Sequence, residues 1–201
     1  PEALVKFING YLSPMTRIVL EEGGTLDKYI GDALMAFWGA PVPQEDHALR
    51  ACRTALRFLE ELETLRKGWR EEGLPEIEIG IGINSGTMVV GNMGSDLRFD
   101  YTVMGDAVNM ASRLEAANKL FHTSIMVSED TWKRIASQAT GRRLGSLRLR
   151  GRSEPVRVWE LMALRPPTPQ EEATIARFEA AVDALAARRV QEAEAGFQAV
   201  L

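Results

Sequence analysis

The sequence has little cysteine, little histidine and no long apolar run. Its single cysteine, Cys52, cannot form an internal disulfide, which favours a reducing compartment, and we expect a cytoplasmic location. No apolar run approaches the roughly 20 residues needed to cross a bilayer, and no signal peptide is visible. We therefore expect no membrane contact within this chain, while a tether supplied by regions outside it stays open.

An excess of positive charge is also missing. The net charge is −4 and the pI is about 5.4, which gives no support for nucleic acid as a partner. A Ser-His-Asp pattern, Cys/His metal spacing and a Walker-type phosphate loop are absent, and we interpret His47 and His122 as structural. With 45% hydrophobic and 26% charged residues, the composition is that of an ordinary globular domain.

The first half of the chain alternates helical and extended patterns. A helical pattern opens the chain and stops at Gly23-Gly24. The segments "TLDKYI" and "ALMAFWG" flank Gly31-Asp32, which predicts a hairpin with a two-residue link. "PVPQED" predicts the start of a long helix with acids in its first turn, ending at Gly73.

The next segments predict strands around one more helix. "EIEIGIGIN" alternates strictly, and its bare face at Gly80 and Gly82 suggests that another backbone or a ligand approaches closely. "TMVVGNMG" and "FDYTVMG" predict a strand pair with its tip at Ser95-Asp96. Asp106 is expected to cap a helix with these inward residues: Ala107, Met110, Ala111, Leu114 and Ala117.

A short strand, a short helix over residues 128–135 and a closing hairpin with Gly151 near its turn complete the domain. The order predicts an α+β fold with one mainly antiparallel sheet flanked by helices. The pattern resembles a ferredoxin-like core whose first strand is absent.

A helical extension follows the domain. "RPPTP", residues 165–169, is a linker, and residues 170–201 form two helical stretches that resemble the start of a tetratricopeptide-type array. One such pair cannot bury its own face. The tail is therefore either the start of a longer array or a helix pair docked elsewhere.

The hairpin at residues 25–37 carries two candidate functional groups. Asp32 in a turn ordinarily just satisfies turn backbone, but between such apolar strands it is also a candidate Mg²⁺ ligand. Lys28 is either an exposed strand lysine or a hydrogen-bond donor to a base or a phosphate.

Asn109 and Arg113 form a second candidate pair. They are four residues apart in the predicted helix after Asp106, so they share a face. That face is either a solvated flank or a pair of donors to phosphoryl oxygens as charge develops on them.

In combination, these segments resemble the catalytic domain of class III nucleotide cyclases of the bacterial adenylate cyclase type. The resemblance rests on four ordered segments within residues 1–164: "GGTLDKYIGDALMAFWGAP", "IGINSGTMVVGNMGS", "DYTVMGDAVNMASRLEAANK" and "LRLRGRSEPVRVWEL". Four ordered matches are far more specific than a single Gly-Asp pair.

The resemblance implies a site shared between two copies of the chain in a head-to-tail dimer. Two aspartates of one copy hold two metal ions, Mg²⁺ or Mn²⁺, and Asp32 matches the second of them. Lys28 matches the residue that selects adenine, and Thr102 stands at the second base-selecting position, where many adenylate cyclases have Asp. Thr at this position resembles a subclass often stimulated by bicarbonate.

The remaining matched positions concern the phosphates. Asn109 and Arg113 match the transition-state pair of the family. Arg150 stands where a phosphate-binding lysine is usual, which keeps the charge but changes the hydrogen-bond geometry.

The family's first metal aspartate lies before the helix that opens this chain at Pro1. We therefore read the chain as part of a longer protein, with half of the metal site, and expect it to be inactive by itself.

The sequence thus predicts an adenylate cyclase domain that converts ATP to cyclic AMP and pyrophosphate as a homodimer. Two alternatives stay open: a cyclase-like dimerisation and signalling module without turnover, and a guanylate cyclase. Lys28 counts against the last, because guanylate cyclases carry Glu there.

Overall fold

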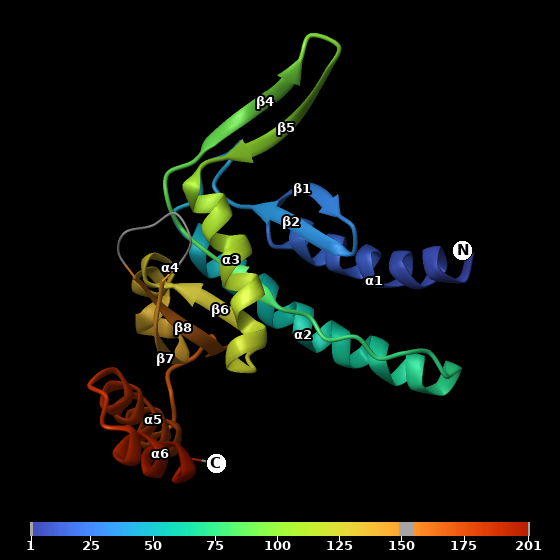
Figure 1. The fold of residues 1–201 in the computed structure, drawn as a ribbon. Helices are drawn as coiled ribbons and strands as arrows, with labels where there is room; N and C mark the ends of the chain where they lie inside the picture. The colour runs from blue at the N-terminus through green and yellow to red at the C-terminus, as the bar shows by residue number, and fades with distance from the viewer. Residues whose placement is uncertain (1, 149–154, 201) are drawn as a thin grey trace. The chain divides into compact units, whose positions relative to one another are not determined.

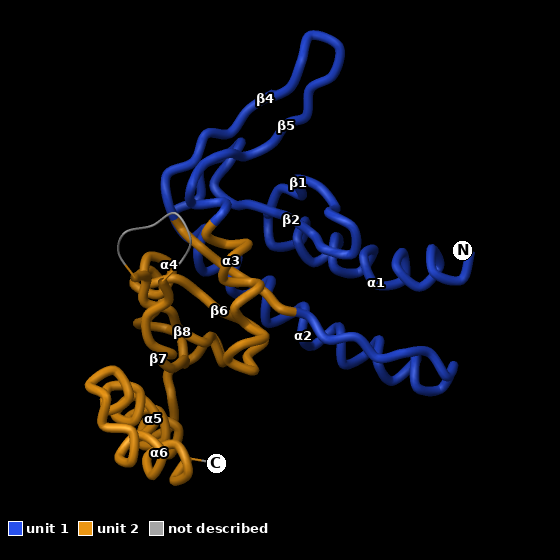
Figure 2. The backbone as a smooth tube through the Cα atoms, viewed as in Figure 1, with its two compact units in different colours: residues 1–79, 86–109 blue, residues 80–85, 110–201 orange. Residues whose placement is uncertain are grey.

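The computed structural model describes residues 2–148 and 155–200 (Figure 1). The chain divides into two compact units, residues 1–79 with 86–109 and residues 80–85 with 110–201 (Figure 2). None of the described helices combines the length and the apolar character that a bilayer crossing requires.

The first unit contains two long helices and two hairpins. Its elements are α1 (Glu2–Glu21), β1 (Thr25–Ile30), β2 (Ala33–Phe37), α2 (His47–Glu72), β4 (Val89–Ser95) and β5 (Arg98–Met104). Helix α1 buries Met15 and Val19, and α2 buries Cys52 and Leu62, as their apolar periodicity requires.

The start of α2 differs from the prediction. The helix begins at His47, so the acids of "PVPQED" precede it rather than occupying its first turn. Asp46 stands at the N-cap but makes no capping hydrogen bond, because its carboxylate accepts from Arg50 Nε at 2.8 Å instead.

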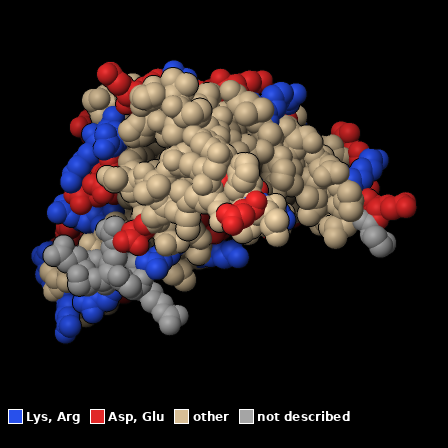
Figure 3. All heavy atoms as spheres, turned by 90° about the horizontal axis from the view of Figure 1, so that it is seen from above, with Lys and Arg blue, Asp and Glu red and all other residues tan. Residues whose placement is uncertain are grey.

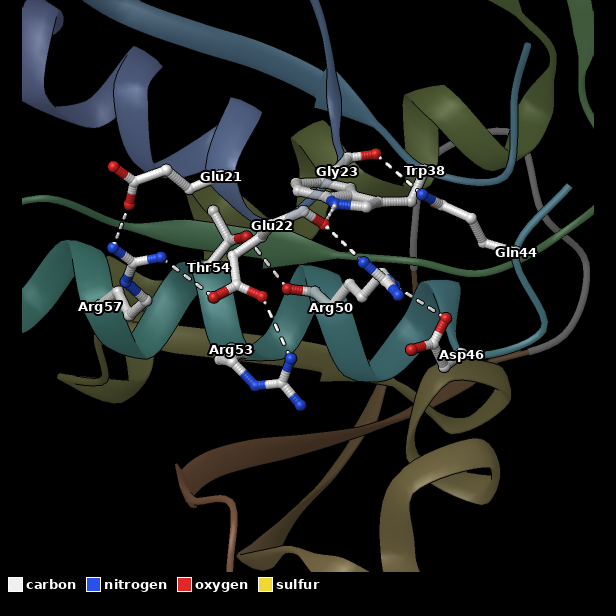
Figure 4. Close-up of polar contacts among 10 residues, drawn as sticks. All are labelled: Glu21, Glu22, Gly23, Trp38, Gln44, Asp46, Arg50, Arg53, Thr54 and Arg57. Carbon is white, nitrogen blue, oxygen red and sulfur yellow. Dashed lines mark hydrogen bonds and ion pairs between the residues drawn. The ribbon is translucent and has the colours of Figure 1, made fainter. Parts of the chain in front are cut away.

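A cluster of polar contacts attaches the β1–β2 hairpin to α2 (Figure 4). The carboxylate of Glu22, a residue that is 9% exposed, accepts from Arg53 at 3.1 Å and Arg57 at 3.0 Å, both on α2. The Glu22 carbonyl accepts from the Trp38 indole at 3.2 Å. These bonds hold the entry and the exit of the hairpin on the same helix.

Both hairpins of the first unit confirm the predicted strand pairs. Ile30 pairs with Ala33 around Gly31-Asp32, and Gly31 has φ +66°, at the position that type II′ hairpins give to glycine. In β4–β5, Ser95 pairs with Arg98, so the tip is residues 96–97, one residue later than predicted.

The second unit is built on a four-stranded sheet. Its elements are β3 (Ile81–Ile83), most of α3 (Asp106–Phe121), β6 (Ile125–Ser128), α4 (Glu129–Ile135), η1 (Ala136–Gln138), β7 (Thr140–Leu147), β8 (Val156–Ala163), α5 (Pro169–Ala186) and α6 (Val190–Gln198). The strand order is β3-β6-β8-β7, with β3 parallel to β6 and the other pairs antiparallel.

The α+β class is confirmed, but two details of the predicted sheet are wrong. The described strands form three sheets rather than one, because alternation shows which face a strand buries and not which strand it pairs with. The strand expected over residues 76–84 is only Ile81–Ile83. The turn of the closing hairpin, with Gly151, lies outside the described residues.

The bare glycine face of this segment lies against a helix backbone, as one of the two expectations had it. A Cβ atom on Gly82 would lie 2.1 Å from the Ala111 carbonyl oxygen of α3, and one on Gly80 would lie 3.1 Å from that of Glu115. The glycines therefore permit close packing of β3 on α3, whose residues Met110 and Leu114 are buried as predicted.

We predict that Gly82→Ala destabilises the protein by more than the about 1–3 kcal/mol of ordinary overpacking, because the new methyl group meets backbone that cannot rotate away. The control is Gly68→Ala in α2, where a Cβ meets nothing within 4 Å and should stabilise the helix by about 0.5–1 kcal/mol. Urea unfolding measures the change in the free energy of unfolding, which should be negative for Gly82→Ala and positive for Gly68→Ala. Equal stabilities of the two variants would contradict the close packing.

The two C-terminal helices pack on the sheet of their own unit. The guanidinium of Arg142 in β7 lies 4.1 Å from the centre of the Phe178 ring in α5, and Arg143 pairs with Asp183 at 2.8 Å. The ring centres of Phe178 and Phe197 are 5.3 Å apart between α5 and α6. Helix α5 thus buries part of its apolar face against β7. That the two helices begin a tetratricopeptide-type array stays a prediction.

Candidate functional site

The Asp32 carboxylate lies exposed at the turn between β1 and β2. Within the part of the chain that the structure describes, it makes no hydrogen bond and no ion pair. Its charge is felt by Tyr11 of α1, whose pKa is raised first by burial and then by the negative charge of Asp32. Asp32 is therefore a free carboxylate, as a ligand for an incoming cation must be.

A metal ion at Asp32 would need ligands from elsewhere. Among the described residues, no group of three His, Cys, Asp or Glu side chains could hold one. Mg²⁺ is commonly bound by one or two carboxylates together with substrate phosphates rather than by a cage of protein ligands. A single free carboxylate fits a metal ion that arrives with a phosphorylated ligand.

Lys28 and Thr102, distant in the sequence, meet at the carboxylate of Asp27. The Thr102 hydroxyl donates to Asp27 Oδ2 at 2.7 Å, and the Val103 N–H donates to the same oxygen at 3.3 Å. The Lys28 ammonium lies 3.3 Å from Asp27 Oδ1. The structure thus brings the two predicted base-selecting residues to one place.

The sequence did not identify Asp27 as a candidate site residue, because the alternation of side chains along β1 does not predict that its side chain is buried. Leu26 pairs with Ala36 and Lys28 with Met35, so Asp27 is the extra residue of a β-bulge. A bulge re-aims a side chain, and here the Asp27 side chain is only 1% exposed while that of Lys28 is 43% exposed. The available signal was a charged pair, Asp27-Lys28, inside an otherwise apolar strand.

Asn109 and Arg113 lie one turn apart on α3. Asn109 is exposed and Arg113 is half-buried, and neither side chain makes a hydrogen bond or an ion pair among the described residues. Asp106 is the first helical residue rather than the cap, because the Gly105 carbonyl accepts from the Val108 N–H at 3.1 Å. An amide and a guanidinium without partners can donate to an anion.

The structure does not bring all predicted residues into one measured site. Asp32, Lys28, Thr102 and Asn109 belong to the first unit, and Arg113 belongs to the second. Arg150 lies outside the described residues. The described groups can supply a metal ligand, two contacts to a polar base and two donors to a phosphoryl group.

Comparisons with known proteins show the family of this chain. The family model for the adenylate and guanylate cyclase catalytic domain matches residues 1–163. Adenylate cyclase 1 of Rhizobium meliloti (strain 1021) is 38% identical over 164 residues, which cover 82% of this chain. The chain spans about a quarter, 25%, of that relative's length.

Two solved structures are similar as well. The adenylyl cyclase CyaB from P. aeruginosa has a TM-score of 0.76 at 36% identity, covering 84% of this chain and 86% of that one. The guanylyl cyclase Cya2 has a TM-score of 0.74 at 32% identity, covering 84% and 85%. The fold, the family model and the relatives agree, and the chain belongs to the family of adenylate and guanylate cyclase catalytic domains.

Proposed function

We propose that this domain converts ATP to 3′,5′-cyclic AMP and pyrophosphate. The observation that carries the choice of ATP is the meeting of Lys28 and Thr102 at Asp27. A lysine donates to adenine N1, which is an acceptor, whereas guanine presents an N1–H donor there. A mismatched polar pair costs about 1–3 kcal/mol, so Lys28 favours adenine over guanine.

The proposed site is shared between two copies of the chain. Exposed apolar side chains of the β4–β5 hairpin are typical of an interaction surface: Val89, Leu97, Phe99 and Met104. The view in Figure 3 shows a broad area with few charged side chains. We propose that the apolar surface of the β4–β5 hairpin pairs with a second copy of the chain. In this dimer, Asp32 of one copy and Asn109 and Arg113 of the other would contact one triphosphate.

The residues then divide the chemistry. The ribose 3′ hydroxyl loses its proton to solvent, its oxygen bonds to the α-phosphorus, and the bond from that phosphorus to the bridging oxygen breaks, so that pyrophosphate leaves. Asn109 orients the ribose, and Arg113 donates to the α-phosphate oxygens as charge develops on them. Asp32 is the residue of this chain that would hold Mg²⁺ or Mn²⁺, and such an ion would neutralise negative charge on the phosphates. Arg150 is proposed to bind phosphate.

The test is a cyclase assay on the full-length protein with Mg²⁺ or Mn²⁺, with ATP or GTP, and with or without bicarbonate. We expect cyclic AMP from ATP and little cyclic GMP. We propose that Thr102 makes the activity responsive to bicarbonate. Because ATP is a cytoplasmic substrate, we also propose a cytoplasmic location. No cyclic nucleotide with either metal would favour the signalling module, and preferential cyclic GMP formation would favour a guanylate cyclase.

We predict that Lys28→Glu reverses part of the base preference. ATP turnover should fall by about 10-fold or more relative to GTP turnover, because the donor to adenine N1 becomes an acceptor. Inhibition by inorganic tripolyphosphate should change much less. Since the introduced carboxylate would lie beside Asp27, Lys28→Ala serves as the control that only removes the donor; an unaltered ATP-to-GTP preference in both variants would exclude base reading by Lys28.

A further inference from the structure

Asp27 is a buried carboxylate held in a fixed orientation. Its side chain is 1% exposed, and Oδ2 accepts two hydrogen bonds, from the Thr102 hydroxyl at 2.7 Å and the Val103 N–H at 3.3 Å. Oδ1 has no hydrogen-bond partner among the described residues, and the Lys28 ammonium lies 3.3 Å from it. One carboxylate thus contacts both predicted base-selecting residues.

The bond to Asp27 decides what Thr102 can offer a ligand. A hydroxyl has one proton and two lone pairs, so a free threonine can donate to a ligand or accept from it. An ionised carboxylate can only accept, so the single proton of Thr102 is committed to Asp27. Thr102 is 8% exposed, which leaves little access to water as a competing partner. Toward a ligand, its hydroxyl is therefore an acceptor only.

An acceptor at this place distinguishes the two kinds of purine. Adenine carries an exocyclic amine at position 6, a donor, whereas guanine and hypoxanthine carry an oxygen there, an acceptor. The amine matches a hydroxyl that can only accept, and the oxygen opposes it. The same carboxylate holds the Lys28 ammonium beside Thr102, so a donor and an acceptor stand together in the pattern complementary to adenine.

We propose that Asp27 is a positioning residue for base selection, which fixes the Thr102 hydroxyl as an acceptor and thereby rejects 6-oxopurine nucleotides. The inference rests on the proposed function, because it assumes that Lys28 and Thr102 face the base. It adds a residue that touches no substrate atom and acts through its neighbours.

The experiment compares ATP with inosine triphosphate (ITP), a 6-oxopurine nucleotide, in the full-length protein. Asp27→Ala frees the Thr102 proton, and we expect the ratio of kcat/KM for ATP to that for ITP to fall by about 10- to 100-fold. Asp27→Asn is the matched control, since its amide oxygen can still accept from Thr102 and Val103. Both variants lose the charge beside Lys28, so the difference between them isolates the effect on Thr102.

Two further variants complete the design. In a Thr102→Ala background, Asp27→Ala should cause no additional change in the ATP-to-ITP ratio. Asp27→Leu fills the space of the carboxylate without accepting a hydrogen bond, and replaces Asp27→Ala if thermal unfolding shows that the alanine variant does not fold.

The outcomes separate the inference from the proposed function. A reduced ratio in Asp27→Ala or Asp27→Leu, with a ratio near that of the wild type in Asp27→Asn, supports the inference. Equal losses for ATP and ITP in all variants would show a structural tie between β1 and β5 only, and would overturn it. Displacement of a fluorescent nucleotide by ATP and by ITP gives the ratio of their binding affinities without turnover, and this ratio should fall in the same variants. If the proposed function is wrong, the wild-type protein will neither form cyclic AMP nor bind ATP.

Discussion

Asp32→Ala in the full-length protein should abolish metal-dependent cyclic AMP formation. A metal ion supplies several kcal/mol of charge stabilisation in the transition state, so we expect kcat to fall by about 1,000-fold. Stability should hardly change, because Asp32 is exposed and makes no hydrogen bond or ion pair among the described residues. Initial rates over a range of Mn²⁺ concentrations, with thermal unfolding in parallel, measure both effects.

The control for Asp32→Ala is Asp130→Ala, an exposed carboxylate at the start of α4 with no proposed role. This variant should keep the turnover and the metal dependence of the wild type. A second readout follows from Tyr11, whose pKa is raised first by burial and then by the charge of Asp32. Asp32→Ala should lower the Tyr11 pKa even without metal. Unchanged turnover in Asp32→Ala would end the metal assignment.

The second large effect is expected for Asn109→Ala. If Asn109 orients the ribose only as the reaction proceeds, kcat should fall by about 100- to 1,000-fold with little change in KM. A rise in KM at unchanged kcat would instead assign Asn109 to ground-state binding.

A second asparagine on the same helix provides a matched contrast. The Asn118 side chain is buried and donates to the carbonyls of Ile81 at 3.1 Å and Leu114 at 3.2 Å. Asn118→Ala should therefore lower the free energy of unfolding by about 1–3 kcal/mol. Asn109→Ala should leave that free energy near the wild-type value, because Asn109 is exposed.

Much of the fold followed from local patterns. The apolar stripes of α1 and α2 and the Gly31-Asp32 turn are determined within a few residues of each other, and they were predicted correctly. The division into three sheets and the parallel pairing of β3 with β6 depend on contacts distant in the sequence. No local pattern encodes such contacts, and the single sheet predicted from alternation was wrong.

The candidate site shows the same limit. Asp32, Asn109 and Arg113 were found from spacing and resemblance, and the structure leaves all three without hydrogen-bond or ion-pair partners among its described residues. Asp27 was not found, because a β-bulge turns it inward against the alternation of its strand. Its bond to Thr102 joins residues on β1 and β5 and needs the folded chain.

The most direct measurement mixes two inactive variants, Asp32→Ala and Asn109→Ala, of the full-length protein. In a mixed dimer, one of the two sites would combine an intact Asp32 with an intact Asn109 from different copies, and random pairing should restore about a quarter of wild-type cyclic AMP formation. Recovery near that level, from variants that are each inactive alone, is the result expected for a shared site. No recovery in mixed dimers whose formation is verified would place Asp32 and Asn109 of the same copy at one site, and would contradict the account.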